Sequence, residues 1–446
     1  MKKNEKMSVP VNGAGSVAFS TLGCKVNQVE TEELKQALID NGFRVVGSDQ
    51  PADFCVVNTC TVTRRSDFES RNLVRRAAKR RGGEGARVIV TGCYAQREGE
   101  ELLKLPNVAA VIGADRKGRI LEVINRLRTE TGTIVDIGEA AAAADFRSYP
   151  ISGLGDRARA FLKVQDGCRG GCSFCIVPSV KGPSRSRTID DAVAAAGELV
   201  ERGFRELVVC GIQLGYYGRD LDPEVSLAEL LEALTAVEGL GRVRLSSIKP
   251  DLVDDHLIDL VSGHPKLCRH IHLSFQSADN TILELMNRNY DADYLEKFLG
   301  RLAAAAPDIG LGGDMIVGHP GETESAFENT YSRIEAWPVA FLHVFRYSDR
   351  PGTTSSRLPG QVPEDLKKER SRRLRELMRE KGRIYAGRFV GREIEVLVEK
   401  VEGGLSYGLS DNYLRVEFPG VNRVGELCRV RIRAARDSKL LGEAAE

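Results

Sequence analysis

Residues 161–187 read FLKVQDGCRGGCSFCIVPSVKGPSRSR, and the three cysteines in this stretch decide how the rest of the chain is interpreted. Cys168, Cys172 and Cys175 follow a short apolar run with the spacing C-x3-C-x2-C, which lets three sulfurs converge from one glycine-rich loop. No fourth cysteine and no histidine lies in or just after the loop, so a four-ligand zinc site fits poorly. Three thiolates suit a 4Fe–4S cluster that keeps one iron open for a small molecule. The alternative is three buried structural cysteines.

The sequence around these cysteines resembles one family of enzymes. The words VQDGC, CIVP and GPSRSR are similar to those of the radical S-adenosylmethionine (SAM) methylthiotransferases. The resemblance implies that the cluster on Cys168, Cys172 and Cys175 binds SAM through its open iron. It extends from about Ser16 to Leu441, which is nearly the whole chain.

Composition sets limits on the class of protein. The chain has 446 residues, of which 42% are hydrophobic and 28% are charged, and its formal net charge is +1. This length predicts roughly three globular domains, and the small net charge means that any nucleic-acid surface must be local. The basic start MKKNEK is followed by no apolar segment long enough for a signal peptide or a membrane span, so we expect a cytoplasmic protein. Ten cysteines in such a chain favour metal binding over disulfides.

Residues 16–130 repeat three times a pattern of apolar run, cysteine and helix-like segment. The cysteines that end the runs are Cys24, Cys60 and Cys93. The alternation predicts parallel strands joined by helices, and ligands gather outside the carboxyl ends of such strands. These thiols can therefore meet in space, although strand-end cysteines can equally be small packed residues. The words LGCKVNQ, VNTCTVT and TGCYAQ resemble the amino-terminal methylthiotransferase domain, which implies that the three thiols hold an auxiliary 4Fe–4S cluster.

The remaining four cysteines are expected to be structural. Each lies in an apolar run without a partner at ligand spacing, and free cysteine is among the most buried residue types. We therefore place these side chains in the core: Cys55, Cys210, Cys268 and Cys428.

The segment after Cys60 is strongly basic. Only Asp67 and Glu69 balance its cations, which are Arg64, Arg65, Arg71, Arg75, Arg76, Lys79, Arg80 and Arg81. A run of charge is usually a solvated helix face, but this one begins beside a predicted cluster ligand. It is therefore either a solvated face or an RNA contact.

A second set of strand and helix pairs follows a predicted interdomain linker, residues 132–156, where an alanine run leads to a glycine-rich turn. Besides the run before Cys168, the strand candidates are residues 205–210, 242–247, 269–275, 311–317 and 340–345. Six βα units fall short of the eight that close a full barrel, and the resemblance implies an open six-unit radical SAM barrel.

The chemistry of such barrels lies at the carboxyl ends of the strands. These ends are residues 211–215, 274–277, 318–322 and 347–353, of which the resemblance implies that the first and third approach SAM. His319 stands where an aromatic residue is expected before Pro-Gly-Glu, so no role is transferred to it. No single side chain is assigned as catalytic.

The carboxyl-terminal part begins with a charged helix over 364–383, whose mixed signs favour a solvated connector. From Arg388 short alternating strands with glycine turns predict a small β-barrel. Three arginines in its last predicted strand share one face, because they recur every second residue: Arg429, Arg431 and Arg433. The pattern resembles the TRAM domain, an RNA-binding module, and the alternative is a solvated arginine face.

The expected architecture is therefore an α/β protein in three parts. Residues 16–130 form a parallel α/β domain with the auxiliary cluster, residues 154–384 form a partial (β/α)6 radical SAM core, and residues 387–446 form the TRAM barrel.

The resemblance also implies a reaction. One SAM methylates a sulfur on the auxiliary cluster, a second is cleaved to a 5′-deoxyadenosyl radical that takes hydrogen from C2 of an adenine, and the methylthio group is installed there. Such a C–H bond offers no acidic proton, so the hard step must belong to a cofactor. The expected partners are the tRNA anticodon loop and an electron donor such as flavodoxin or ferredoxin, and we expect a monomer.

The expected substrate is N6-threonylcarbamoyladenosine (t6A) at tRNA position 37, because the words around the cysteines are those of the t6A branch. The carboxylate of this substrate calls for a cation, and Arg64 and Arg65 are the candidates. Alternative substrates are isopentenylated adenosine at position 37 and a ribosomal-protein aspartate. A non-catalytic iron–sulfur or zinc RNA-binding protein is a more distant alternative.

Overall fold

The computed structural model describes residues 15–79, 86–143, 145–148, 157–420 and 422–445. These residues form two compact units. The first contains the described residues up to Gly153 together with Gly167–Arg169 and Ile176–Pro183, and the second contains those of Leu154–Asp166, Gly170–Cys175 and Ser184–Glu446. Within the described residues, no helix is both long enough and apolar enough to cross a membrane.

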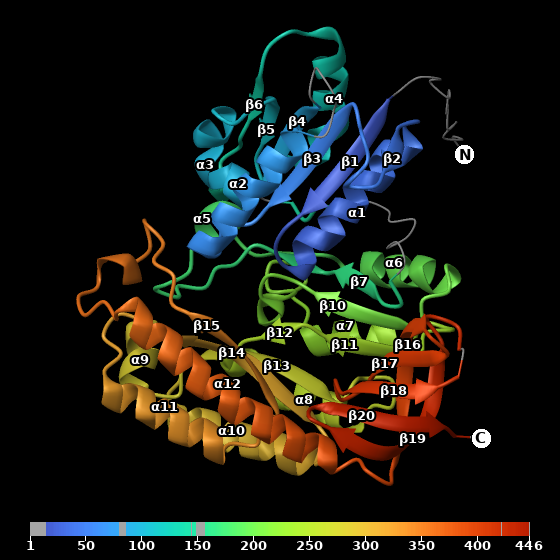
Figure 1. The fold of residues 1–446 in the computed structure, drawn as a ribbon, viewed down its shortest axis with the longest axis vertical. Helices are drawn as coiled ribbons and strands as arrows, with labels where there is room; N and C mark the ends of the chain where they lie inside the picture. The colour runs from blue at the N-terminus through green and yellow to red at the C-terminus, as the bar shows by residue number, and fades with distance from the viewer. Residues whose placement is uncertain (1–14, 80–85, 144, 149–156, 421, 446) are drawn as a thin grey trace. The chain divides into compact units, whose positions relative to one another are not determined.

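The described residues of the first unit form a parallel sheet of six strands in the order β2-β1-β3-β4-β5-β6 (Figure 1). The strands are β1 Ser16–Thr21, β2 Arg44–Val46, β3 Phe54–Thr59, β4 Arg87–Gly92, β5 Val108–Ile112 and β6 Ile134–Asp136. The three cysteine-ending runs of the sequence are β1, β3 and β4, and these strands are neighbours in the sheet. The prediction of parallel strands joined by helices is confirmed.

Helices cover both faces of this sheet. Helices α1 Lys25–Asp40 and α4 Ile120–Thr129 pack on one face, and α2 Arg64–Ala78 and α3 Cys93–Leu103 pack on the other. The strands are therefore buried on both sides, and β3 is buried at every position. The carboxyl ends of the strands are left as the place where side chains can gather.

The predicted linker 132–156 contains more structure than the sequence suggested. Residues Ile134–Asp136 are strand β6, and Ala140–Ala142 form a short 3-10 turn. A strand of three residues is too short to show periodicity, which is why it was missed. Residue 144 and residues 149–156 lie outside the described residues.

Among the described residues, the second unit has six parallel strand positions, which confirms the predicted six βα units. They pair in sequence order: β7 Ala160–Lys163, β10 Glu206–Cys210, β11 Arg242–Leu245 continued by β12 Ser247–Ile248, β13 His270–Gln276, β14 Gly310–Val317 and β15 Phe341–Arg346. The third position is divided at Ser246, so that β11 pairs with β10 and β12 pairs with β13. In the described part of the chain no pairing joins β7 to β15, and the sheet is open.

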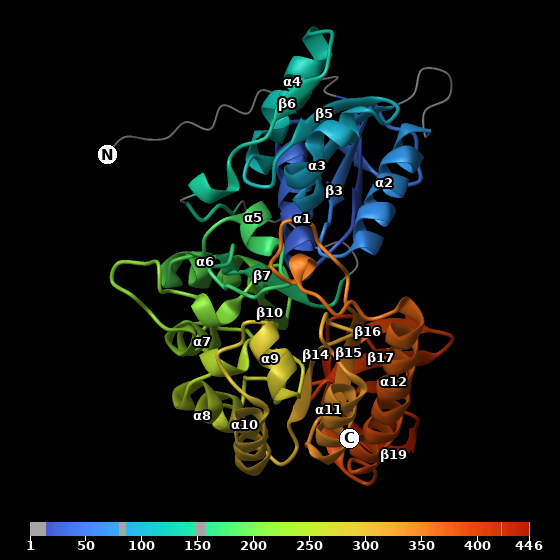
Figure 2. The ribbon, with the colours of Figure 1, turned by 90° about the vertical axis from the view of Figure 1, so that its left-hand side faces the viewer.

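One face of this sheet is apolar and covered by helices (Figure 2). Ile271, Leu273 and Phe275 of β13 are on this face, and each is 0% exposed. The covering helices are α6 Ile189–Glu201, α7 Leu227–Thr235, α8 Asp255–Gly263, α10 Ala292–Ala305, α11 Glu324–Ala336 and α12 Glu364–Gly387. Shorter elements are α5 Val177–Lys181 in the first unit, and β8 Gln165–Asp166, β9 Arg185–Ser186 and α9 Asn280–Leu285 in the second.

Helix α12 is not the solvated connector that its mixed charges predicted. Leu374, Met378 and Tyr385 are buried on one side of it, and the helix packs against β15. Arg370 on the same helix is also buried, and its Nη1 lies 2.7 Å from a carboxylate oxygen of Glu322. Counting charges missed these apolar residues, which recur at helical spacing on one face.

The described residues after 387 form a closed barrel of five strands, which confirms the predicted small β-barrel (Figure 1). Its strands are β16 Glu393–Glu402, β17 Leu405–Ser410, β18 Arg415–Pro419, β19 Leu427–Arg436 and β20 Lys439–Ala444. Val396, Phe418 and Val430 are 0% exposed in its interior. Strand β20 was not among the predicted strands, yet it closes the barrel by pairing with both β18 and β19.

The barrel is joined to the core strands through buried charges. Arg242 and Arg244 of β11 bind Glu206 of β10 at 2.6 and 2.8 Å. The same two guanidiniums donate to the carbonyl oxygens of Leu409 and Ser410 in the barrel, at 2.8 and 2.9 Å. Because buried charges are tolerated only when they are paired, this turn of the barrel completes the amino-terminal end of the core.

Candidate active site

Three predicted ligands come together at the carboxyl ends of neighbouring strands in the first unit. Cys24 is the N-cap residue of α1, Cys60 directly follows β3, and Cys93 begins α3 after β4. A Cβ added at Gly23 would lie 3.1 Å from the Cβ of Cys60, and the charges of Cys24 and Cys60 both reach Cys93. The structure therefore gathers these thiols as the parallel topology predicted.

Two asparagines from the sequence words hold the strand ends in place. The side-chain amide of Asn27 donates to the carbonyl oxygens of Leu22 and Thr59, at 2.9 and 3.1 Å. The amide of Asn58 donates to the carbonyl oxygen of Asn27 at 2.9 Å. These bonds connect α1, the end of β1 and β3 beside Cys24 and Cys60. The sequence motifs LGCKVNQ and VNTC are therefore in direct contact in the structure.

A buried charge cluster lies beside Cys93. Glu30 of α1 accepts hydrogen bonds from Lys117 and Lys181, and these three residues are 5%, 6% and 3% exposed. Burial raises the pKa of the Cys93 thiol to about 12, and the charges of Lys181 and Lys117 oppose that rise. Burial also raises the pKa of Cys60. The two ammonium groups thus favour the thiolate form that an iron ligand needs.

Cys168 begins the central loop and belongs to the first unit. Its amide donates to the carbonyl oxygen of Gly182 at 3.0 Å. Gly167 before it has a φ of +68°, and a Cβ there would lie 1.9 Å from the carbonyl oxygen of Pro183. Only glycine fits at this position, so a substitution of Gly167 would displace the start of the cysteine loop.

Cys172 and Cys175 belong to the second unit, and the amide of Cys175 donates to the carbonyl oxygen of Cys172 at 3.1 Å. The Nη1 atom of Arg288 lies 3.3 Å from Sγ of Cys172, and the guanidinium lies 5.9 Å from the ring centre of Phe174. Sequence reasoning missed Arg288, because it lies 116 residues after Cys172 and outside every motif. This contact places a positive charge and an N–H donor beside the sulfur of Cys172.

His319, to which no role was transferred, supports the same loop. Its Nε2 lies 2.8 Å from Oγ of Ser355, which lies 2.8 Å from Oγ of Ser173. Burial lowers the pKa of His319 to about 4, so the imidazole is neutral at pH 7. The histidine therefore serves as a hydrogen-bond partner rather than as a charge.

Two of the predicted strand-end segments are held by side-chain hydrogen bonds. In the first, the backbone N–H of Gln213 donates to Oε1 of Gln165 at 2.8 Å. In the third, the carboxylate of Glu322 accepts from the amide of Gly318 and from Arg370, at 2.8 and 2.7 Å. Burial raises the pKa of Glu322 to about 7, while the two donors act in the opposite direction.

The basic helix after Cys60 is partly engaged in local contacts. Arg64 and Arg65 are exposed in the first turn of α2, and Nε of Arg65 lies 2.7 Å from the carboxylate of Glu69. Arg71 donates to the hydroxyl of Tyr94. Arg80 and Arg81, which were part of the predicted basic run, lie outside the described residues.

The three arginines of strand β19 lie on one exposed face as predicted. Arg431 binds Glu393 at 2.6 Å, and Arg433 binds Glu443. Two of the three guanidiniums are therefore already paired with a carboxylate of the barrel. Ion pairs this exposed contribute little to stability, so they can exchange a carboxylate for a phosphate.

The four cysteines expected in the core lie in apolar surroundings. Cys55, Cys210 and Cys268 are 1%, 1% and 3% exposed. Cys428 is half-buried and packs against the interior of the carboxyl-terminal barrel.

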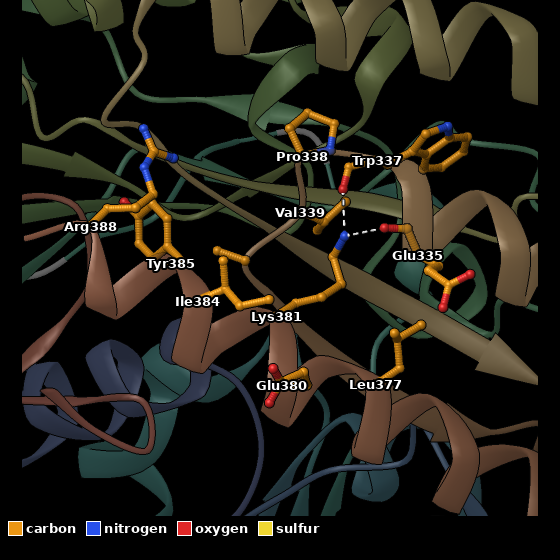
Figure 3. Close-up of a pocket in the computed structure, with 11 residues that line it drawn as sticks. Glu335, Trp337, Pro338, Val339, Leu377, Glu380, Lys381, Ile384, Tyr385 and Arg388 are labelled. Atoms are coloured by element: carbon orange, nitrogen blue, oxygen red, sulfur yellow. Dashed lines mark hydrogen bonds between the residues drawn. The ribbon is translucent and has the colours of Figure 1, made fainter.

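A pocket on the second unit is lined by residues of α12 and of the segment between α11 and β15 (Figure 3). It has a volume of about 350 Å³ and lies between α12 and the segment that leads into β15. Nζ of Lys381 donates there to the carbonyl oxygens of Glu335 and Trp337, at 2.6 and 2.7 Å. The lysine thus completes the end of α11, and the pocket adjoins the amino-terminal end of β15 rather than its carboxyl end.

Two family models match the chain. The model described as "Uncharacterized protein family UPF0004" matches residues 16–113, and the model of the "Radical SAM superfamily" matches residues 162–334. The first range contains Cys24, Cys60 and Cys93, and the second contains the central cysteine loop.

Curated relatives are similar over nearly their whole length. Threonylcarbamoyladenosine tRNA methylthiotransferase MtaB of Bacillus subtilis is 37% identical and covers 94% of each chain. The protein of the same name from Aquifex aeolicus is 38% identical and covers 93% of this chain and 100% of its own. The tRNA-2-methylthio-N(6)-dimethylallyladenosine synthase of Clostridium novyi is 32% identical and covers 95% of each chain.

Solved structures share the fold. The radical SAM methyltransferase TsrM from Kitasatospora setae, with tryptophan and a SAM analogue bound, has a TM-score of 0.55 at 16% identity and covers 76% of this chain and 75% of its own. OxsB, a cobalamin-dependent radical SAM enzyme, has a TM-score of 0.51 at 12% identity and covers 82% of this chain and 56% of its own. The curated relatives, similar from end to end, establish more than a fold: this chain is a transferase whose cofactors are SAM and two 4Fe–4S clusters, and it belongs to the radical SAM tRNA methylthiotransferases.

Proposed function

We propose that this enzyme installs a methylthio group on C2 of t6A at position 37 of tRNA. The observation that carries the proposal is the meeting of three thiols at neighbouring strand ends, in a chain that also has a central loop with three more. Two such sets supply two separate centres, one for SAM and one for the sulfur that is transferred. We assign the first centre to Cys168, Cys172 and Cys175, and the second to Cys24, Cys60 and Cys93.

The donor sets fit iron–sulfur clusters. All ten cysteines are free thiols, and buried ammonium groups favour the ionised form of Cys93. Cys172 has the guanidinium of Arg288 beside its sulfur. Soft thiolates in sets of three leave one iron of each cluster without a protein ligand.

The roles of the protein's own groups follow from these contacts. When bound, the clusters and SAM supply the electron, the hydrogen abstraction and the methylthio group. Arg288 donates to the sulfur of Cys172, and the hydrogen bond between Ser173 and Ser355 holds the loop that carries this cysteine. Lys117 and Lys181 keep positive charge beside Cys93. The protein's own residues thus position the reacting groups and balance their charge.

The choice of t6A is supported by the names and the identities of the relatives. Three relatives named for threonylcarbamoyladenosine are 36–38% identical, and two more are 32% and 33% identical. Three relatives named for dimethylallyladenosine are 32–34% identical. The second candidate substrate is therefore isopentenylated adenosine at the same tRNA position. We further propose tRNA contact by the carboxyl-terminal barrel, a flavodoxin or ferredoxin as electron donor, and a monomeric enzyme.

The test is mass spectrometry of tRNA nucleosides from a strain that lacks this protein. We expect 2-methylthio-t6A to disappear, t6A to accumulate, and methylthio-isopentenyladenosine to be unaffected. Expression of the intact chain should restore the product, whereas the matched variants Cys60→Ala and Cys55→Ala should fail and succeed respectively. Loss of methylthio-isopentenyladenosine instead would show that isopentenylated adenosine is the substrate.

A further inference from the structure

The inner face of strands β13, β14 and β15 carries polar and aromatic side chains, in contrast to the apolar face under the helices. Gly312 of β14 pairs with His272 of β13 and with Phe341 of β15, and Asp314 pairs with His343. Paired residues of adjacent strands lie on the same face of a sheet. We call this surface, made of His272, Asp314, Phe341, His343 and Phe345, the inner platform.

The amino-terminal end of the inner platform is closed by the carboxyl-terminal barrel. The ring of Tyr413 stacks on His270 at 4.3 Å and lies 5.4 Å from the ring of Phe341. A Cβ at Gly310 would lie 2.2 Å from the carbonyl oxygen of Asn412. The barrel therefore covers this end of the platform, and the carboxyl ends of the strands lie on the opposite side from it.

Three side chains on the platform form one hydrogen-bonded group. Oδ1 of Asp314 lies 2.9 Å from Nε2 of His272 and 3.3 Å from Nδ1 of His343. Both imidazoles direct a nitrogen at the same carboxylate oxygen, so each donates an N–H to it. The carboxylate therefore fixes the orientation of both rings, and Nε2 of His343 is left on the side of that ring away from Asp314.

The platform continues toward the central cysteine loop. The side chain of His343 is 59% exposed, and Phe345, two residues further along β15, is 46% exposed. Phe345 pairs with Ile316, and Ile316 packs in the same cluster as Phe174, which lies between Cys172 and Cys175. A molecule on these exposed rings therefore lies beside the loop that we assign to SAM.

We propose that the inner platform binds the modified nucleoside, with Phe345 against the adenine ring and His343, held by Asp314, donating from Nε2 to the carboxylate of the threonylcarbamoyl group. This inference rests on the proposed t6A substrate and adds the residues that recognise it. An exposed phenyl ring matches a nucleobase, because aromatic side chains stack on bases. An exposed imidazole N–H matches a carboxylate, which an isopentenyl group lacks.

The same three side chains could also hold a divalent metal ion, since two histidines and a carboxylate are common ligands. We commit to the anion site, because Oδ1 of Asp314 is within hydrogen-bonding distance of Nε2 of His272. A metal ion would need the lone pair of that nitrogen instead.

The experiment compares two substrates with reconstituted holoenzyme: a t6A anticodon stem-loop, and the same stem-loop whose threonyl carboxylate is converted to its amide. For wild-type enzyme we expect the amide to raise KM about tenfold or more. His343→Ala should raise KM for the acid to a similar extent and leave the amide unchanged. Phe345→Ala should raise KM for both substrates, and Phe345→Tyr should leave both KM values close to those of wild type. The matched control is His256→Ala, which removes an exposed histidine on the far, helix-covered side.

The outcomes separate the inference from the function on which it rests. If wild-type enzyme does not modify the t6A stem-loop at all, the proposed function fails. Suppose instead that wild-type enzyme modifies the stem-loop. Then an unchanged KM of His343→Ala for the acid, or an equal rise in KM for the acid and the amide, overturns only the platform assignment. Zinc or iron beyond the two clusters that is lost in Asp314→Asn would replace the anion site with a metal site.

Discussion

Nζ of Lys181 lies 2.7 Å from Oε1 of Glu30, and both side chains are almost fully buried, with exposed fractions of 2% and 6%. We predict that Lys181→Met lowers the free energy of unfolding by roughly 1–3 kcal/mol, because a buried carboxylate loses a charged donor. It should also weaken retention of the auxiliary cluster, since Cys93 loses a nearby positive charge. Thermal unfolding of the metal-free protein and iron loss in the presence of a chelator measure the two effects. Lys104→Met, which breaks the exposed pair with Glu101, should change neither.

The two cysteine sets predict an iron count. Reconstituted protein should hold about eight irons and eight sulfides, and the triple alanine variant of Cys24, Cys60 and Cys93 should hold about four of each. Cys55→Ala should retain all of them, because that thiol is buried in the core between the helices α2 and α3 and the sheet. Chemical iron and sulfide analysis gives the answer. An unchanged count in the triple variant would refute the auxiliary site.

The division of labour between the sets gives a third prediction. Cys172→Ala should abolish reductive formation of 5′-deoxyadenosine, because the central loop then lacks a ligand for the cluster that binds SAM. Cys60→Ala should still form it but give no methylthio product. Cys210→Ala, a buried cysteine at the end of β10, serves as the control and should behave as wild type. Liquid chromatography of both products decides, and the assignment fails if the Cys60 variant cleaves no SAM with its other cluster intact.

Glu206 predicts a loss of stability in acid. Burial alone would raise the pKa of this carboxyl, but Arg244 and Arg242 outweigh it and lower the pKa to about 2. The ordinary value is 4.5, so this group's contribution is present above pH 4.5 and is lost as the pH falls toward 2. Urea unfolding followed between pH 6 and pH 3 should show this slope on the order of a few kcal/mol in total. Glu206→Gln should be less stable at pH 6 and should lack that part of the slope.

The exposed arginines of β19 predict the salt dependence of tRNA binding. If each arginine contacts a phosphate, Arg429→Ala, Arg431→Ala and Arg433→Ala should each reduce the slope of log Kd against log salt by about one. Glu393→Gln should strengthen binding, because it frees Arg431 from its carboxylate. Filter binding at several salt concentrations measures both. Unchanged slopes in the arginine variants would leave the face as a solvated surface.

The sequence predicted those parts of the molecule that are local or periodic. The strands that end in Cys24, Cys60 and Cys93 could be found because an apolar run marks a strand buried on both faces, and parallel strands bring their carboxyl ends together. The six core strands were found in the same way. The central cysteine loop was recognisable because its three cysteines lie within eight residues.

Other parts could not be predicted, because they depend on contacts between distant residues. Arg288 reaches Cys172 from 116 residues away, and Lys117 reaches Glu30 from 87 residues away. Neither lies in a motif, and a single lysine or arginine in a sequence is usually solvated. The inner platform was missed for the same reason, since His272, Asp314 and His343 come from three different strands. The predicted division into three domains remains a prediction, and the described residues form two compact units.

The turn that carries Leu409 and Ser410 has a consequence for the order of events during synthesis. The buried Arg242, Arg244 and Glu206 obtain part of their hydrogen bonds from carbonyl oxygens that are translated more than 160 residues later. When the nascent chain has emerged only as far as α12, these carbonyl oxygens are missing, and the amino-terminal end of the core strands is still open to water. The core should reach its full protection from proteases only when the last segment leaves the ribosome, so premature stop codons in that segment would remove the whole enzyme rather than a single module.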